Sequence, residues 1–255
     1  MTSAKPWVLV GCGRMGSALL KGWGAGAVVV EPSNPACLPD IEAAGAITPE
    51  LVVFAVKPQQ MAEVLPAYKR FAGSATFLSI AAGKTIAGFE AALGHQAAIV
   101  RCMPNTPAAI GKGITVAVAN KNVTNAGKAL ADKALRAGGM VEWVEDENLL
   151  DAVTALSGSG PAYVFHLVEA MAKAGAAMGL EPALAMKLAR QTVIGSGHLL
   201  EQSPHEPAGK LREAVTSPGG TTAAALAVLM GDEKLQKLMT EALKAAQARG
   251  RELAG

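Results

Sequence analysis

The sequence has few aromatic and few charged residues. Aromatic side chains make up 4% of its 255 residues and charged residues 17%, whereas hydrophobic residues make up 51%. This balance excludes an intrinsically disordered chain and requires a core built mainly from aliphatic side chains. The formal net charge is +2, and no dense cluster of Lys and Arg occurs. We therefore expect neither nucleic acid nor an anionic membrane surface as a partner.

Cysteine and histidine are also scarce. Cys12, Cys37 and Cys102 match neither a disulfide framework nor a zinc spacing, which favours reduced thiols in a cytoplasm. The four histidines are scattered, so we expect no metal site. No run approaches the ~20 apolar residues that span a bilayer, and the N-terminus does not resemble a signal peptide. We expect a soluble, cytoplasmic protein.

Short apolar runs alternate with helix-like stretches through the first half of the chain. Several runs are apolar on both faces, as strands of a buried parallel sheet are. Helix-like segments such as residues 17–23 and 60–71 lie between them. This alternation predicts an α/β Rossmann domain with a doubly wound, mainly parallel sheet. The predicted strands are residues 7–10, 27–30, 51–56, 75–80, 98–103, 114–118 and 141–144.

The second half of the chain is helical almost throughout. Between residues 152 and 180 only Glu169 and Lys173 carry charge, whereas a surface helix normally has a polar face. We interpret this stretch as part of a subunit interface; a central helix buried inside the monomer is the alternative. We place the domain boundary between residues 1–145, the α/β domain, and residues 146–255, the all-helical domain.

Residues 11–16 have the pattern G-x-G-x-x-G, directly after the first predicted strand and at the start of a helix. Gly11 permits a tight turn, Gly13 lets the backbone approach a pyrophosphate, and Gly16 lets helix and strand pack closely. The N–H groups at the helix start then face the phosphates. Glycine-rich turns are common, but this strand–loop–helix context predicts dinucleotide binding.

The end of the second predicted strand bears on the choice of cofactor. Glu31 lies about 20 residues beyond Gly11, where an acid accepts hydrogen bonds from the ribose hydroxyls and repels a 2′-phosphate. This favours NADH. Ser33 and Asn34 follow with donors that can hold that phosphate, so NADPH stays open.

Three further loops follow predicted strands, where doubly wound sheets bind their ligands. Lys57 and Pro58 follow the third strand, and Lys57 can neutralise a phosphate or simply be solvated. Ala82 follows the fourth strand in a turn of small residues. Asn105 follows the fifth between two prolines, where it can meet a nicotinamide ring or substrate; taken alone, that loop is equally consistent with a rigid turn.

Residues 215–222 read V-T-S-P-G-G-T-T and precede an Ala-rich helix. The first N–H groups of a helix are unpaired, and its dipole favours an anion there. Two glycines let a carboxylate approach the backbone, and Thr221 and Thr222 add hydroxyls. The cluster exceeds what a helix cap requires, so it predicts a carboxylate site.

Taken together, the motifs resemble those of pyrroline-5-carboxylate reductases. The G-x-G-x-M-G loop, V-K-P-Q, A-A-G, R-x-M-P-N-T-P, S-G-S-G-P-A-Y (residues 157–163) and V-T-S-P-G-G-T-T occur in the family's order, from residue 7 to about residue 230. The last two are highly specific. The resemblance implies reduction of 1-pyrroline-5-carboxylate to L-proline by hydride transfer from NADPH or NADH, the last step of proline biosynthesis. It also implies a helical dimerisation and substrate-binding domain, a homodimer and further assembly of dimers into rings.

The resemblance also assigns site residues. To the cofactor candidates Glu31, Ser33 and Asn34 it adds Gly11, Gly13, Met15, Gly16, Val56, Lys57, Pro58, Ala82 and Asn105. For the substrate it implies Glu147, Val215, Ser217, Gly219, Gly220, Thr221 and Thr222. Thr222 is the candidate catalytic residue, because its hydroxyl can hold the imine N–H or help deliver a proton, and no Lys or His need act as a general acid.

The resemblance is weakest at residues 35–51. This segment holds three prolines and is shorter than the family's helix between the second and third strands. We therefore expect a stunted or absent helix there, and an altered pocket for the adenine end of the cofactor.

Two rival functions remain. One is a reductase of another cyclic imine or of a hydroxy acid on the same fold; hydroxy-acid enzymes usually place a lysine where this chain has Tyr163 and His166, with Lys173 only later. The other is a non-catalytic nucleotide-binding regulator, which has no reason to keep the anion site.

Overall fold

The computed structural model describes residues 5–24 and 26–254, which form two compact units. The first unit contains the chain up to Ser159 together with the chain from Ala246 onward, and the second is Gly160–Ala245. The compact units divide after Ser159, and the boundary between residues 145 and 146 that the sequence suggests stays a prediction. Gly158 packs against the sheet: a Cβ there would come within 2.5 Å of Met103 Cε, at the end of a central strand.

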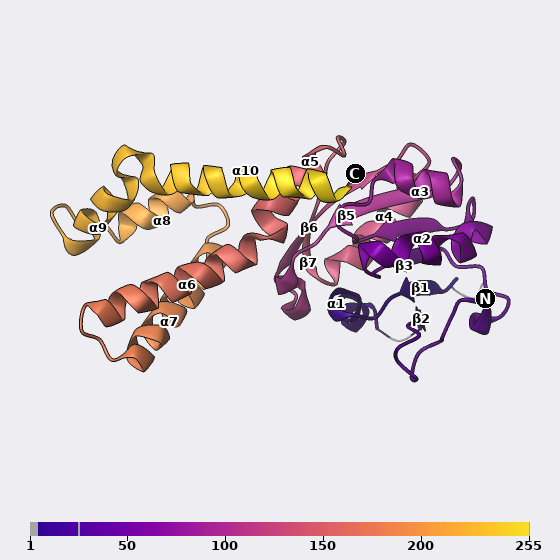
Figure 1. The fold of residues 1–255 in the computed structure, drawn as a ribbon, viewed down its shortest axis with the longest axis horizontal. Coiled ribbons are helices and arrows are strands. Elements are labelled where there is room, and N and C mark those ends of the chain that lie inside the picture. The colour runs from indigo at the N-terminus through magenta and orange to yellow at the C-terminus, as the bar shows by residue number, and fades with distance from the viewer. Residues whose placement is uncertain (1–4, 25, 255) are drawn as a thin grey trace. The chain divides into compact units, whose positions relative to one another are not determined.

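Seven strands of the first unit form one sheet in the order β2-β1-β3-β4-β5-β6-β7 (Figure 1). Neighbouring strands are parallel except for the antiparallel pair β5 and β6, which confirms the predicted mainly parallel sheet. The strands are β1 (Trp7–Val10), β2 (Val28–Val30), β3 (Leu51–Phe54), β4 (Thr76–Ser79), β5 (Ala98–Met103), β6 (Gly113–Ala119) and β7 (Gly139–Trp143).

Helices cover both faces of this sheet. The described helices of the first unit include α1 (Arg14–Trp23), α2 (Met61–Val64), α3 (Ile86–Leu93), α4 (Asn125–Arg136) and α5 (Leu149–Val153). One buried cluster unites β-strand residues with side chains of α2 and α3, and the other unites them with α1 and α4. Because side chains alternate along a strand, Val8 and Val10 belong to the first cluster and Leu9 to the second.

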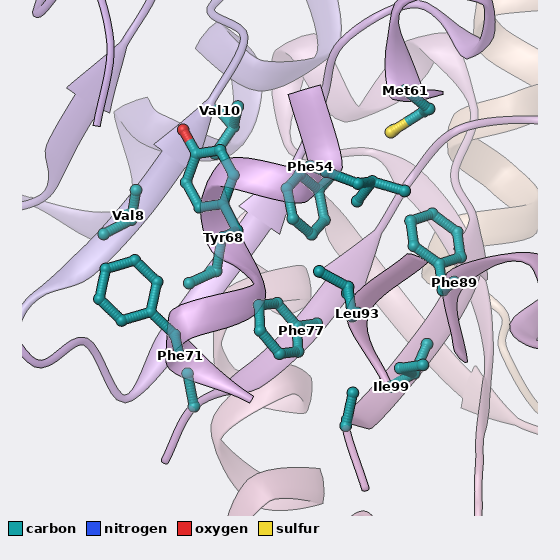
Figure 2. Close-up of a cluster of buried hydrophobic side chains, with 14 of the residues drawn as sticks. Val8, Val10, Phe54, Met61, Tyr68, Phe71, Phe77, Phe89, Leu93 and Ile99 are labelled. Carbon is teal, nitrogen blue, oxygen red and sulfur yellow. The ribbon is translucent and has the colours of Figure 1, made fainter. Parts of the chain in front are cut away.

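The first cluster gathers half of the chain's aromatic rings, although aromatics are few. Phe54 stacks on Phe77 and Phe89, with ring centroids 6.0 and 6.1 Å apart, and meets Tyr68 edge-on at 5.3 Å. Figure 2 shows these rings packed beside Phe71. Edge-to-face and offset pairs of this kind add to the stabilisation that burial gives.

Two segments between strands depart from regular α-helix. Residues 58–71 form 3₁₀-helix (Pro58–Gln60), the short helix α2 and 3₁₀-helix again (Leu65–Phe71), rather than the single helix expected, because Pro66 has no N–H to continue it. Residues 35–51 hold only the 3₁₀-helix Glu42–Ala44 among their helical elements. This confirms the expectation that the helix between β2 and β3 is stunted or absent.

The second unit contains α6 (Gly160–Ala177), α7 (Pro182–Gln202), α8 (Ala208–Ala214), α9 (Thr221–Met230) and most of α10 (Lys234–Ala254). Helices α6 and α7 form a hairpin, and small residues let them approach closely. A Cβ on Gly175 would lie 3.3 Å from Ala185 Cβ, and both residues are buried.

Large apolar side chains remain exposed on the same hairpin, including Phe165 at 65% and Leu188 at 50%. A helix buried inside the monomer would have covered them, so the interface interpretation is the one that fits. Among the described helices, none is long and apolar enough to cross a membrane.

Candidate active site

The first site lies where the strand order of the sheet reverses, beside β1. The chain passes from β1 to β2 on one side and then returns to β3 on the other, and ligands bind at such a point, beyond the carboxyl ends of the strands. Val10, Val30 and Phe54 lie in one row of the sheet. The loops that follow these three residues therefore begin at the same edge.

The glycine-rich loop has the geometry that its sequence predicts. Gly11 has a φ of +91°, and a Cβ there would lie 2.8 Å from Val56 N. A Cβ on Gly16 would overlap the Gly11 carbonyl oxygen. At Gly13, by contrast, no described atom lies within 4 Å of the Cβ position. Two glycines thus close the turn against β3, and the third leaves open space beside the start of α1.

Glu31 is tied into this loop by its carboxylate. Its Oε2 accepts a hydrogen bond from Cys12 N at 2.9 Å. Its Oε1 accepts bonds from the Ser33 hydroxyl at 2.6 Å and from Ser33 N at 3.2 Å. The Ser33 hydroxyl and then the Cys12 N–H stabilise the charged form, which lowers the pKa of Glu31 below its ordinary value. The side chain is therefore ionised at neutral pH.

A pocket of about 570 Å³ opens at these loops, within the size range of small-ligand sites. Six predicted cofactor residues line it: Gly11, Gly13, Glu31, Ser33, Val56 and Lys57. Six others do not: Met15, Gly16, Asn34, Pro58, Ala82 and Asn105. The sequence did not point to the pocket's far wall, formed by residues 39–42 and by side chains from residues 60–68.

A dinucleotide fits the residues present. The open space at Gly13 admits a pyrophosphate, the N-terminus of α1 supplies N–H groups, and Glu31 offers an acceptor for ribose hydroxyls. Lys57 is exposed at the pocket, where it can neutralise phosphate. Among the described residues, no group of three or more His, Cys, Asp or Glu side chains could hold a metal.

The Asn105 side chain forms hydrogen bonds to two other segments of the first unit. Its Oδ1 accepts from Ile114 N at 3.0 Å, and its Nδ2 donates to the Ser157 carbonyl at 3.3 Å. Ser157 belongs to a π-helical turn, Thr154–Gly158, and such turns occur frequently at functional sites. The amide thus links the loop after β5 to the S-G-S-G-P segment. Contact with a nicotinamide ring stays a prediction.

Glu147 is engaged inside the first unit. Its Oε1 lies 2.6 Å from Arg101 Nη1, in an ion pair whose side chains are 7% (Arg101) and 28% (Glu147) exposed. The same oxygen accepts from Ile86 N at 2.8 Å, at the start of α3. Sequence reasoning gave Arg101 no role, although a charged residue inside an otherwise apolar strand was the available signal.

The predicted carboxylate site, residues 215–222, belongs to the helical unit. The N-cap of α9 is Gly220, which has no side chain to cap the helix, so the first-turn N–H groups around Thr221 and Thr222 receive no bond from it. Gly219 has a φ of +70°, and Gly220 N donates to the Ser217 carbonyl at 3.1 Å. The turn is compact and glycine-lined, as an approaching carboxylate requires.

Comparison with known proteins gives a consistent family. Residues 147–253 match the family model described as pyrroline-5-carboxylate reductase dimerisation. The chain is 38% identical over 265 residues to pyrroline-5-carboxylate reductase of Pseudomonas aeruginosa, covering 96% of this chain and 95% of the relative. It is 42% identical over 217 residues to that of Synechocystis sp., covering 84% and 79%.

Solved structures agree with this assignment. A pyrroline-5-carboxylate reductase from Coxiella burnetii has a TM-score of 0.85 at 32% identity, covering 99% of this chain and 100% of that one. Pyrroline carboxylate reductase of Plasmodium falciparum, solved with NADP bound, has a TM-score of 0.82 at 29% identity and covers 99% of each chain.

Proposed function

We propose a residue-level account of catalysis for this chain, which belongs to the pyrroline-5-carboxylate reductase family. It is an NAD(P)H-dependent oxidoreductase that reduces 1-pyrroline-5-carboxylate to L-proline. The observation that carries this function is similarity over nearly the full length to named reductases. The pocket at the loops that follow β1, β2 and β3 supports it. When bound, the reduced nicotinamide supplies the hydride that adds to the C=N carbon.

The glycine-rich loop and the strand ends hold the cofactor in this proposal. Gly13 and the N-terminus of α1 receive the pyrophosphate, and Lys57 neutralises part of its charge. Glu31 holds the adenosine ribose. The remaining cofactor candidates complete the site around the nicotinamide end and beneath the loop: Met15, Gly16, Ser33, Asn34, Val56, Pro58, Ala82 and Asn105.

The start of α9 holds the substrate. Its first-turn N–H groups and the Thr221 hydroxyl bind the carboxylate, where the helix dipole favours an anion. The Thr222 hydroxyl binds the ring nitrogen, accepting a hydrogen bond from its N–H or relaying a proton to it. The carboxylate then fixes the ring, so that one carbon is presented for hydride addition. The other substrate candidates are Glu147, Val215, Ser217, Gly219 and Gly220.

Self-association is a property of the family's dimerisation domain, which matches from residue 147. We assign dimerisation and substrate binding to residues 146–255 and cofactor binding to residues 1–145. A groove of about 330 Å³ between α6 and α7, lined by Phe165 and Met186 among other apolar side chains, is where the partner chain would pack. Assembly of dimers into rings, a cytoplasmic location and the absence of a nucleic-acid partner are further proposals.

The test is loss of absorbance at the reduced-nicotinamide band, with 1-pyrroline-5-carboxylate as substrate and NADPH and NADH supplied in parallel. Rapid oxidation is expected, with L-proline as the product in amounts equal to the cofactor consumed. Protein that binds a reduced cofactor but oxidises neither would contradict the assignment. Other cyclic imines in the same assay, and a hydroxy acid supplied with NAD⁺ or NADP⁺ in the reverse direction, would reveal the rival enzymes.

A further inference from the structure

We propose, on the basis of the proposed cofactor site, that this chain selects NADH over NADPH through Glu31 and the acidic wall of the pocket. The family assignment covers both cofactors and does not decide between them. The preference follows instead from how the carboxylates and hydroxyls around the pocket are already hydrogen bonded.

Glu31 is fixed in place by the two segments that would surround the ribose. Its Oε2 accepts from Cys12 N in the glycine-rich loop, and its Oε1 accepts from Ser33, beyond β2. Because a carboxylate oxygen can accept two hydrogen bonds, Oε2 retains an acceptor position for a ribose hydroxyl. A 2′-phosphate has no proton to donate at that position and adds negative charge against a carboxylate that cannot easily move away.

The Ser33 hydroxyl, which could have held a 2′-phosphate, is directed to Glu31 instead. The Ser33 hydroxyl donates its proton to Glu31 at 2.6 Å. Asn34 presents its Oδ1 to Ala36 N at 3.1 Å, so an acceptor occupies that turn. Of the two residues that left NADPH open in the sequence, Ser33 therefore supports the Glu31 carboxylate, whereas the Asn34 amide oxygen bonds within its own turn.

Further acidic side chains line the same pocket. Asp40, Glu42 and Glu63 line it together with Glu31. Among the lining residues, Lys57 supplies the single positive charge. Asp40 accepts a bond from Ala43 N at 2.8 Å, which holds the shortened segment after β2 in place.

The acidic side chains also act on Tyr68, which lines the same pocket. Burial raises the pKa of Tyr68, and the carboxylates of Glu42 and Asp40 raise it further, against an opposing effect of Arg70. Arg70 itself lies 3.9 Å from Glu42 and donates to the Ile41 carbonyl. It therefore offsets part of the charge from outside the pocket lining.

The test compares affinity and turnover for the two cofactors. Calorimetric titration with NAD⁺ and NADP⁺ measures binding without catalysis, and kcat/KM for NADH and NADPH measures selection during reduction. We expect NAD⁺ and NADH to be favoured by about tenfold or more. Glu31→Gln keeps the size of the side chain and an acceptor for Cys12 N, but removes the charge. It should reduce the preference at least about tenfold.

Two comparison variants make the test specific. Asp40→Asn combined with Glu42→Gln should reduce the NADH preference less than Glu31→Gln does. The effect of this double variant should shrink as the salt concentration is raised, because exposed charges are screened. Glu142→Gln, a matched substitution at an exposed residue of β7, should leave the ratio unchanged. Turnover with both cofactors but no NADH preference, or an unchanged ratio in Glu31→Gln, would overturn the inference and leave the function intact. Failure to bind either dinucleotide would instead refute the proposed cofactor site.

Discussion

Replacing Glu147 with Gln should destabilise the sheet unit, because it leaves the buried Arg101 guanidinium without a counter-charge. The two charged atoms are 2.6 Å apart. At an effective dielectric constant of about 20, that separation corresponds to roughly 6 kcal/mol of gross attraction. Desolvation offsets much of it, and Glu147 is 28% exposed, so we expect a net loss of about 2–3 kcal/mol. The Gln oxygen can still accept a hydrogen bond from Ile86 N. The loss of stability therefore comes mainly from removing the negative charge.

Tryptophan fluorescence during urea denaturation can measure this change in the sheet unit. The chain has three tryptophans, Trp7, Trp23 and Trp143, and all three lie in the first unit. Asp151→Asn is the matched control, because Asp151 pairs at 3.5 Å with Arg251, whose side chain is 64% exposed. Removing this ion pair should cost less than about 1 kcal/mol.

The same variant separates two roles for Glu147. If the carboxylate braces the fold, Glu147→Gln lowers the urea midpoint while KM for the substrate stays close to wild type. If it contacts the substrate, as the family resemblance suggests, KM rises and the midpoint is unchanged. That second result would refute the ion-pair reasoning. Combining Glu147→Gln with Arg101→Met should recover part of the lost stability, because no buried charge is then left unpaired.

Three further predictions concern the cofactor loop, the substrate helix and the interface. Thr222→Ala should lower kcat/KM by about 5- to 150-fold, as expected for a lost hydrogen bond to a charged group, whereas Thr240→Ala on α10 should have no effect; unchanged kinetics would remove Thr222 from the mechanism. Gly13→Ala should fold normally but bind dinucleotide at least about tenfold more weakly in calorimetry, because its methyl group meets the pyrophosphate; intact affinity would argue against the proposed pose. Phe165→Glu should shift the protein toward monomer in analytical ultracentrifugation, whereas Lys173→Glu on the same helix should not; a surviving dimer would place the interface elsewhere.

The strands could be predicted because a buried parallel strand is apolar on both faces. Leu51–Phe54 is fully buried, and its sequence alone marks it as a strand between two layers of helices. The predicted end at residue 56 was too late, because Val56 turns out of the sheet and lines the pocket. A run of apolar letters cannot distinguish a side chain buried in the sheet from one that faces a ligand.

The contacts between distant segments could not be predicted. Arg101 and Glu147 are 46 positions apart, and Asn105 and Ser157 are 52 apart. No periodicity or local propensity records which polar side chains will meet once the sheet has formed. The sequence therefore located the loops after β5 and β7 and assigned Asn105 and Glu147 to ligands, which stays a prediction. It did not show that Glu147 pairs with Arg101 or that Asn105 bonds to the Ser157 carbonyl.

Glu31 couples cofactor selection to the stability of the glycine-rich loop, which limits how the preference can be changed. Hydrogen bonds from Ser33 and Cys12 N lower its pKa, so the carboxylate stabilises the folded loop at any pH above its ordinary value. That contribution is lost as the pH falls through the lower value of the folded state. Glu31→Ser would remove both the charge and the partner of Cys12 N, so it should weaken binding of both dinucleotides. Only a substitution that keeps the hydrogen-bond acceptor for Cys12 N, such as Glu31→Gln, can change the cofactor preference without destabilising the glycine-rich loop.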